Sequence, residues 1–175
     1  NINKKYVGGK KTMSDFNKAV EKVLKFEGIL SNDKYDAGGL TKYGISKRMY
    51  PSLDIANLTQ EQAVAIYKRD YWEKNLCDKI QSQEVAEQIF DIAVNGGLSC
   101  VQRAINSLLP ASAKIKEDGV IGAITLMCIN KFDAKTLNNT IARYRARRFA
   151  SICKSNPTQL VFLEGWLERC FRYII

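Results

Sequence analysis

The sequence predicts an all-α or nearly all-α fold in which one irregular Gly-rich loop interrupts the helices. Three observations favour this fold. Apolar residues recur at helical spacing over most of the 175 residues. Capping residues and Gly or Pro stops divide this pattern into about seven segments. No segment outside the loop shows the alternation of apolar and polar residues that is typical of a strand. The length fits one domain, or one domain with a small appended lobe.

The first helix is expected to follow Ser14, which can cap it, and to end at Glu27-Gly28. Its apolar residues repeat at helical spacing: Phe16, Val20, Val23 and Leu24. The segment from Gly28 to Pro51 is rich in Gly, Asp, Asn, Ser and Tyr, so we expect a long loop or a short irregular hairpin there. A loop of this length in a compact domain is usually functional.

Six further helices are expected from their caps and stops. A Thr-x-x-Gln capping box, Thr59 to Gln62, opens the first of them. The others are capped by Ser82, Asp133 or Asn156, or are bounded by Gly and Pro. The expected helices lie at 59–72, 82–95, 98–109 and 123–130, after Asp133, and after Asn156-Pro157.

The charge balance and the missing histidine limit the function classes. The chain has 27 Lys and Arg against 18 Asp and Glu, a net charge of +9, and no histidine. The surplus favours a polyanionic partner: nucleic acid, an acidic membrane face or a cell wall. The missing imidazole excludes Ser-His-Asp and Cys-His catalysis and every zinc site that needs histidine. Acid–base chemistry must then come from a carboxylate, a lysine or a tyrosine.

Cysteine usage and hydropathy favour a chain without disulfides or membrane spans. The five cysteines form no C-x-x-C pair, and their odd count predicts buried free thiols. No stretch approaches the length of a membrane span, so we expect no membrane insertion. Residues 1–12 carry four lysines but no apolar core. We interpret them as a flexible leader before a natural start at Met13, and not as a signal peptide.

Glu27 is the candidate catalytic acid. It lies where an apolar helix ends and the Gly-rich loop begins. A carboxyl group there can be partly desolvated, which raises its pKa toward the range that a general acid needs. Position alone still favours an ordinary exposed glutamate, because most glutamates are solvated.

The residues around Glu27 favour a catalytic acid over an ordinary exposed glutamate. The landmarks between Phe26 and Ser46 are Glu27-Gly28, Asn32, Asp36-x-Gly38-Gly39-x-Thr41 and Gly44-Ile45-Ser46. This order resembles the opening motif of glycoside hydrolase family 108, which groups N-acetylmuramidases, phage endolysins and secretion activator proteins. One landmark differs, since the second glycine of the family's Glu-Gly-Gly is Ile29. Ile29 in place of glycine affects the backbone geometry after Glu27 more than the acid chemistry of Glu27 itself.

Further motifs extend the resemblance from Met13 to the end of the chain. They are Tyr71-Trp72, Phe90-Asp91-x-Ala93-Val94-Asn95-x-Gly97, Asp118-Gly119-Val120-Ile121-Gly122-x-x-Thr125 and Gly165-Trp166-Leu167-x-Arg169. Short Gly-rich motifs are weak singly, but several in the same order are specific. The resemblance implies a lysozyme-like catalytic part over 13–110. It also implies a helical peptidoglycan-binding-like part over 111–175, packed on the same domain.

The resemblance implies a muramidase that cleaves the β-1,4 bond between N-acetylmuramic acid and N-acetylglucosamine. Glu27 would be essential, and no cofactor or metal would be needed. We expect a monomer whose partner is bacterial peptidoglycan. It would be made in the cytoplasm without a signal peptide and would act on the wall, in the periplasm or outside, after release through a holin or secretion pore.

Two other function classes compete with this interpretation. A non-catalytic peptidoglycan-binding or secretion-accessory protein could share the fold, although the retained Glu27 argues against it. The charge of +9 also suggests a nucleic-acid-binding module. The sequence has no helix-turn-helix signature, zinc ligands or interleaved basic and aromatic strand pattern, so we expect no specific nucleic-acid binding.

Six further residues complete the candidate site. Asp36 is the candidate second carboxylate, or equally an Asx-turn residue leading into Gly38-Gly39. The candidate substrate-binding residues are Thr41, Tyr43, Tyr71, Trp72 and Asn95. Aromatic faces can pack against sugar rings, and the loop around Tyr43 offers that ring few apolar partners. Core packing is the more common fate of a residue such as Trp72.

Two charged features have structural interpretations. Asp91 lies in a helix among apolar residues, so we expect it to be a buried partner of a backbone or arginine group. The arginines between 143 and 148 could bind the acidic cell wall, but such a run is more often a solvent-exposed helix face.

Overall fold

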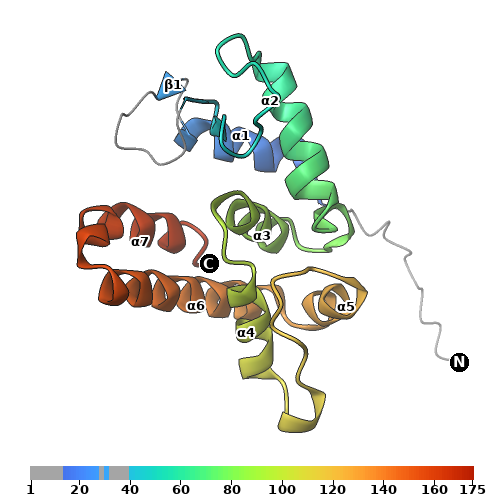
Figure 1. Ribbon diagram of the computed structural model, residues 1–175. Coiled ribbons are helices and arrows are strands. Elements are labelled where there is room, and N and C mark those ends of the chain that lie inside the picture. Colours follow the sequence, from blue (N-terminus) through green and yellow to red (C-terminus); the bar gives the residue numbers. More distant parts are fainter. Residues whose placement is uncertain (1–13, 28–29, 32–39) are drawn as a thin grey trace, which may run out of the picture.

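The fold is built around one buried helix, α3 (Gln83–Asn95). This computed structural model describes residues 14–27, 30–31 and 40–175, and only the backbone of residues 26, 27, 30 and 31. Every residue of α3 from Val85 to Ile92 is buried. A helix buried on all sides needs neighbours around it. Helix α1 (Phe16–Glu27) and the π-helical turn η1 (Lys68–Glu73) contact α3 on one side, and α6 (Ala134–Ser155) contacts it on the other (Figure 1).

The other helices complete two groups on either side of α3. Helix α2 (Gln60–Tyr67) lies with α1, whereas α4 (Ser99–Leu108), α5 (Ala123–Lys131) and α7 (Leu163–Phe171) lie with α6 (Figure 1). Three 3-10 turns join them: η2 (Cys77–Lys79), η3 (Ala111–Ala113) and η4 (Pro157–Phe162). The described residues therefore form seven α-helices, and the predicted helical, lysozyme-like fold class is confirmed.

The predicted loop contains a small antiparallel sheet. Its strands are β1 (Leu30–Ser31), β2 (Thr41–Lys42) and β3 (Ile45–Ser46), in that order. Thr41 lies opposite Ser31 on one side and opposite Ser46 on the other. Residues 28–29 and 32–39, which include Asp36, lie outside the described residues.

Four predicted helix caps are confirmed, and one is wrong. One of the four is Asn156, whose side chain accepts a hydrogen bond from the Thr158 N–H group. Thr59 and Gln62 form the reciprocal capping box, with hydrogen bonds of 2.9 and 3.3 Å. Ser82 accepts a hydrogen bond from the Val85 N–H group, and Asp133 accepts one from Thr136. In the first helix, however, Asp15 rather than Ser14 accepts the hydrogen bond from the first turn, from the Asn17 N–H group at 2.9 Å. The Ser14 hydroxyl instead donates to the Cys77 carbonyl, a partner 63 positions away that local pattern could not reveal.

A buried ion cluster joins α3 to the second group of helices. Asp91 on α3 is fully buried and lies 2.6 Å from Arg145 of α6 and 2.7 Å from Arg169 of α7. The expected arginine partner of Asp91 is thus confirmed. Arg145 is only 2% exposed, so the interpretation of the 143–148 arginines as one solvated face is wrong for this residue. Burying Asp91 requires such partners, because an unpaired charge in the core is very costly.

All five cysteines are free and buried, as predicted. No helix in the described part of the chain is both long and apolar enough to cross a membrane.

Candidate active site

Glu27 is the last residue of α1, so the position of this helix decides where the candidate acid lies. The side chain of Glu27 itself is outside the described atoms. Ala19, Val20 and Val23 of α1 are at most 5% exposed and form part of the core. An amphipathic helix held by such a stripe has a fixed rotation about its own axis. The backbone at Glu27 is therefore fixed relative to α3.

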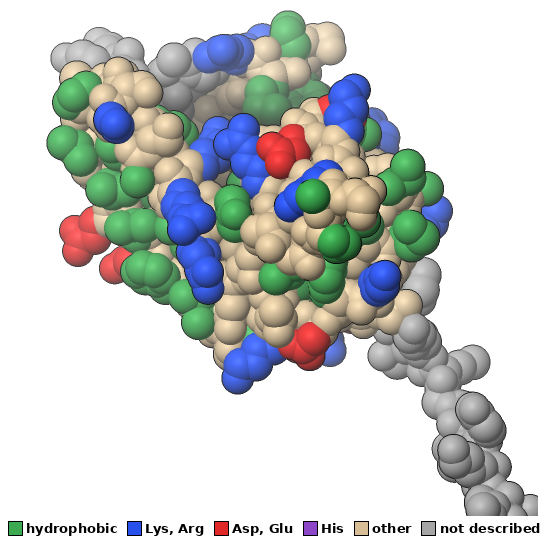
Figure 2. All heavy atoms as spheres, turned by 90° about the horizontal axis from the view of Figure 1, so that it is seen from below, with side chains coloured by type: hydrophobic (Ala, Val, Ile, Leu, Met, Phe, Trp, Pro, Cys, Tyr) green, Lys and Arg blue, Asp and Glu red, His purple; other side chains and the backbone are tan. Residues whose placement is uncertain are grey.

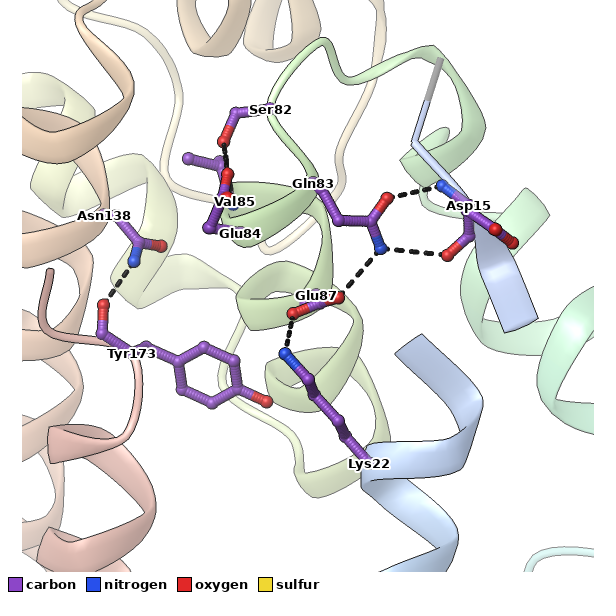
Figure 3. A network of polar contacts seen from close by, with 9 residues as sticks. All are labelled: Asp15, Lys22, Ser82, Gln83, Glu84, Val85, Glu87, Asn138 and Tyr173. Carbon is purple, nitrogen blue, oxygen red and sulfur yellow. Dashed lines mark hydrogen bonds and ion pairs between the residues drawn. The ribbon is translucent and has the colours of Figure 1, made fainter. Parts of the chain in front are cut away.

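Polar contacts strengthen the attachment of α1 to α3 (Figure 3). The Gln83 amide donates to the Asp15 carbonyl at 3.0 Å and to Glu87 at 2.9 Å, and its oxygen accepts from the Asp15 N–H group at 2.5 Å. Lys22 lies 2.5 Å from Glu87, whose side chain is only 5% exposed. A charge-assisted bond to a mostly buried carboxylate fixes position more firmly than a surface pair does. The contacts span α1 from before its first residue to Lys22, five positions before Glu27.

An aromatic cluster packs beneath the same helix. Phe16 meets Trp72 edge-on at 5.7 Å between ring centroids, and Trp72 meets Phe90 in the same way at 5.5 Å. Such edge-to-face pairs stabilise the packing beyond the area they bury. Trp72 is 2% exposed. Trp72 therefore lies in the core, as its position at a helix end favoured. Its contact with substrate stays a prediction.

The hairpin between β2 and β3 has an uncommon turn. Tyr43 and Gly44, its two central residues, have φ angles of 51° and 74°. Two positive φ angles match a type I′ turn, which favours Asn-Gly, so a tyrosine at the first position is strained. The Tyr67 hydroxyl donates to the Tyr43 carbonyl at 2.8 Å and holds the turn against α2. Backbone strain of this kind often accompanies functional sites.

Tyr43 and Thr41 both lie half-buried in this hairpin. The Tyr43 ring packs against the core, and Lys42 lies 5.8 Å from its centroid. The expectation that Tyr43 has few apolar partners was wrong, because the core lies directly below the turn. Part of the ring remains accessible, and its role in substrate binding stays a prediction.

Tyr71 belongs to a second tyrosine group next to the hairpin. It is 8% exposed, and its ring lies 5.7 Å from that of Tyr67, which holds the turn. The Tyr50 hydroxyl donates to Asp70 at 2.8 Å and also interacts with the Tyr71 hydroxyl. Burial raises the pKa of Tyr50, and the hydrogen bond with Tyr71 raises it further. The hydrogen bond from Arg69 lowers the pKa of Asp70, so this carboxylate stays ionised.

Tyr67, Tyr50 and Asp70 were not among the candidate site residues. A buried tyrosine hydroxyl needs a hydrogen-bond partner, and that requirement was the available signal for Tyr67. Sequence alone could not show that the partner is the Tyr43 carbonyl. The structure thus links Tyr43 and Tyr71 through Tyr67, and Thr41 lies in the same hairpin as Tyr43.

Asn95 is the last residue of α3. It is exposed, and its amide donates to the Asp91 carbonyl at 2.8 Å. Among the described residues, no hydrogen bond links Asn95 to the hairpin or to η1. The described part of the chain also contains no group of three or more acidic, Cys or His residues that could hold a metal ion.

Comparisons with known proteins agree with this organisation. Residues 20–97 match the family described as glycosyl hydrolase 108, and residues 97–171 match a predicted peptidoglycan domain. The solved structure of SagA from Brucella abortus is similar, with a TM-score of 0.73 and 26% sequence identity over 90% of each chain. No curated protein matches the chain. The division predicted at residue 110 stays a prediction. The chain therefore combines, in this order, a glycosyl hydrolase 108 region and a predicted peptidoglycan domain, and its function concerns peptidoglycan.

Proposed function

We propose that this protein is a muramidase that cleaves the β-1,4 bond between N-acetylmuramic acid and N-acetylglucosamine, with Glu27 as the general acid. One observation carries the proposal. Glu27 ends a helix anchored on the buried α3, directly before the Gly-rich segment and small sheet, within the glycosyl hydrolase 108 match. This arrangement fixes the backbone that carries the candidate acid, at the end of α1.

Carboxyl groups are sufficient for the proposed reaction. The Glu27 proton passes to the glycosidic oxygen as the bond from that oxygen to the anomeric carbon breaks. The sugar left behind develops positive charge, which a second carboxylate can stabilise. Water then supplies the new hydroxyl group and releases a proton. Asp36 remains the candidate for the second carboxylate, with a turn-forming role as the equal alternative.

The second half of the chain supports wall binding. Residues 97–171 match the predicted peptidoglycan domain, and the net charge is +9. Figure 2 shows many Lys and Arg side chains and few acidic ones on the face seen from below. A bacterial wall carries carboxylates and phosphates, and a positive surface attracts such a polyanion. We further propose that the protein acts as a monomer on the wall, in the periplasm or outside, and leaves the cytoplasm through a holin or secretion pore.

Replacing Glu27 by Gln tests the function directly. The amide keeps the size of the side chain but cannot deliver a proton, so release of reducing ends from purified peptidoglycan should fall by roughly 10²- to 10⁴-fold. Binding to insoluble peptidoglycan should persist, because the basic surface is unchanged. Mass spectrometry of the wild-type digest should find N-acetylmuramic acid at the reducing ends.

Glu21→Gln is the matched control, because Glu21 is an exposed glutamate of the same helix. This variant should cleave like the wild type. If Glu27→Gln also cleaves like the wild type, the active site lies elsewhere and the proposal fails. Digests with N-acetylglucosamine ends would instead indicate a glucosaminidase.

A non-catalytic peptidoglycan-binding or secretion-accessory protein is the second candidate, and the similarity to SagA fits it. In that case the wild type and Glu27→Gln would both bind peptidoglycan, and neither would release reducing ends.

A further inference from the structure

A pocket of about 650 Å³ opens in the second half of the molecule, between α4 and the start of α5. Its wall includes Lys114 to Lys116, Val120, and the first turn of α5 from Gly122 to Thr125. None of the lining residues comes from α1, the sheet or η1. The pocket is therefore separate from the candidate active site.

The first turn of α5 presents unpaired backbone donors to this pocket. Gly122 stands at the N-cap position and has no side chain to accept from the helix, and the first turn carries no acidic residue. Among the described residues, no acceptor is found for the N–H groups of Ala123, Ile124 and Thr125. Such donors, together with the positive end of the helix dipole, favour an anion.

The side chain of Thr125 is a second, independent feature of the same site. Thr125 is only 5% exposed and lines the pocket. Its hydroxyl has no hydrogen-bond partner among the described residues, whereas the comparable Thr140 hydroxyl bonds to the carbonyl four residues earlier, at 2.7 Å. Thr125 therefore presents to the pocket a hydroxyl without a partner among the described residues, and a ligand oxygen can accept from it.

The rest of the pocket is rigid and suits an anion with a small apolar group. The Gln102 amide donates to Asp118 at 2.8 Å and its oxygen accepts from the Gly119 N–H group at 2.7 Å, which fixes the turn before α5. Lys114 and Lys116 line the pocket, and so does Asp118, which lies 3.5 Å from Lys116. These three side chains leave the wall a net charge of +1. Val120 and Ile124 are 63% and 66% exposed, so they offer apolar surface beside the donors.

We propose that this pocket binds the C-terminal D-alanine of a peptidoglycan stem peptide. The carboxylate accepts from the free N–H groups of α5 and from the Thr125 hydroxyl, and the alanine methyl group packs against Val120 and Ile124. This inference rests on the proposed function, because it presumes that the wall is the partner. It assigns the second half of the chain to the peptide and leaves the glycan to the first half.

The test uses the full chain and a soluble stem pentapeptide that ends in D-Ala-D-Ala, with its C-terminal amide as the comparison. Calorimetry should show binding of the free acid and a loss of about tenfold or more for the amide, because a charge-assisted bond is lost. Equal binding of both peptides, or of neither, overturns the proposal. Tighter binding of inorganic phosphate than of the pentapeptide also overturns it.

Gly122 offers a variant that separates binding from folding. Its φ and ψ angles, −95° and −172°, are extended, and an added Cβ atom would meet nothing within 4 Å. In Gly122→Asp the new carboxylate caps the free N–H groups itself. The melting temperature should rise by roughly 1 °C while peptide binding falls about tenfold or more. Gly165→Ala, in α7 and outside the pocket lining, also adds a Cβ atom that meets nothing within 4 Å and should bind like the wild type.

Two outcomes distinguish this inference from the proposed function. If the wild type cleaves glycan but peptide binding is unaffected by Gly122→Asp, the pocket proposal fails and the muramidase proposal stands. If the peptide binds as expected but the wild type releases no reducing ends, the muramidase proposal fails instead. Thr125→Val, which removes only the hydroxyl group, should weaken peptide binding without changing glycan cleavage.

Discussion

At the scale of single residues, burial determines the chemistry of the thiols. Burial raises the pKa of both Cys100 and Cys170 to about 11. It also raises the pKa of Cys77, which is fully buried. The thiolate is the reactive form, so a neutral and buried thiol is inert. The sequence could predict free buried cysteines from their odd number and spacing.

We therefore expect the native protein to react with a thiol-specific reagent at none of its five cysteines at pH 8. After denaturation all five should react. Because the unfolded thiols ionise near pH 9 and the folded Cys100 and Cys170 near pH 11, the unfolded state loses protons first. The free energy of unfolding should then decrease as the pH rises from about 9 to 11. Rapid labelling of the native protein at pH 8 would contradict the burial of these residues.

Tyr43 shows where prediction from single residues fails. Its motif placed it correctly in the Gly-rich segment, because glycines and turn residues act locally. Its left-handed backbone and its packing on the core depend on Tyr67, which lies 24 positions later. Contacts at that separation leave no periodic pattern in the sequence.

At the scale of elements, the helices were the most predictable part of the fold. The caps at Thr59, Ser82 and Asp133 were correct because each uses a residue three positions away. The packing of α3 was less predictable. The sequence suggested one apolar face, whereas every residue from Val85 to Ile92 is buried, since α1 and α6 cover opposite sides. Polar residues such as Asp91 and Glu87 make a fully buried helix look half-exposed in the sequence, because their buried partners cannot be known from it.

The connection from α3 to α4 gives a matched pair of substitutions. Gly96 and Gly97 have φ angles of 80° and 107°, which only glycine adopts without strain. A Cβ atom at Gly97 would lie 2.5 Å from Nε of Arg148, whereas one at Gly96 would meet nothing within 4 Å. Gly96→Ala should therefore cost about 1–3 kcal/mol of backbone strain, and Gly97→Ala up to about 1 kcal/mol more because the end of the Arg148 side chain must move. Urea unfolding measures both, and equal losses would show that the contact with Arg148 is unimportant.

At the scale of the whole molecule, the two family matches do not correspond to two independent structures. They meet at residue 97, just after α3. The core of the first region ends in α3, and the side of α3 away from α1 is covered by α6 of the second region. The resemblance implied the order of the two regions and their packing in one domain, but motifs alone could not show that α3 and α6 form the shared core.

Separating the two regions at residue 97 should consequently destroy the fold of the first. Asp91 would lose both Arg145 and Arg169, and breaking a buried ion pair costs about 3–5 kcal/mol. Ile89 and Ile92, which are fully buried in the intact chain, would lose the cover that α6 gives to α3. Because a domain of this size is stabilised by only about 5–15 kcal/mol, residues 13–97 alone should show no cooperative thermal transition by circular dichroism. The full chain with Asp91→Asn should remain folded but melt at a lower temperature, since the apolar contacts persist. A cooperative transition for the isolated segment would mean that α3 does not depend on the second region for its stability.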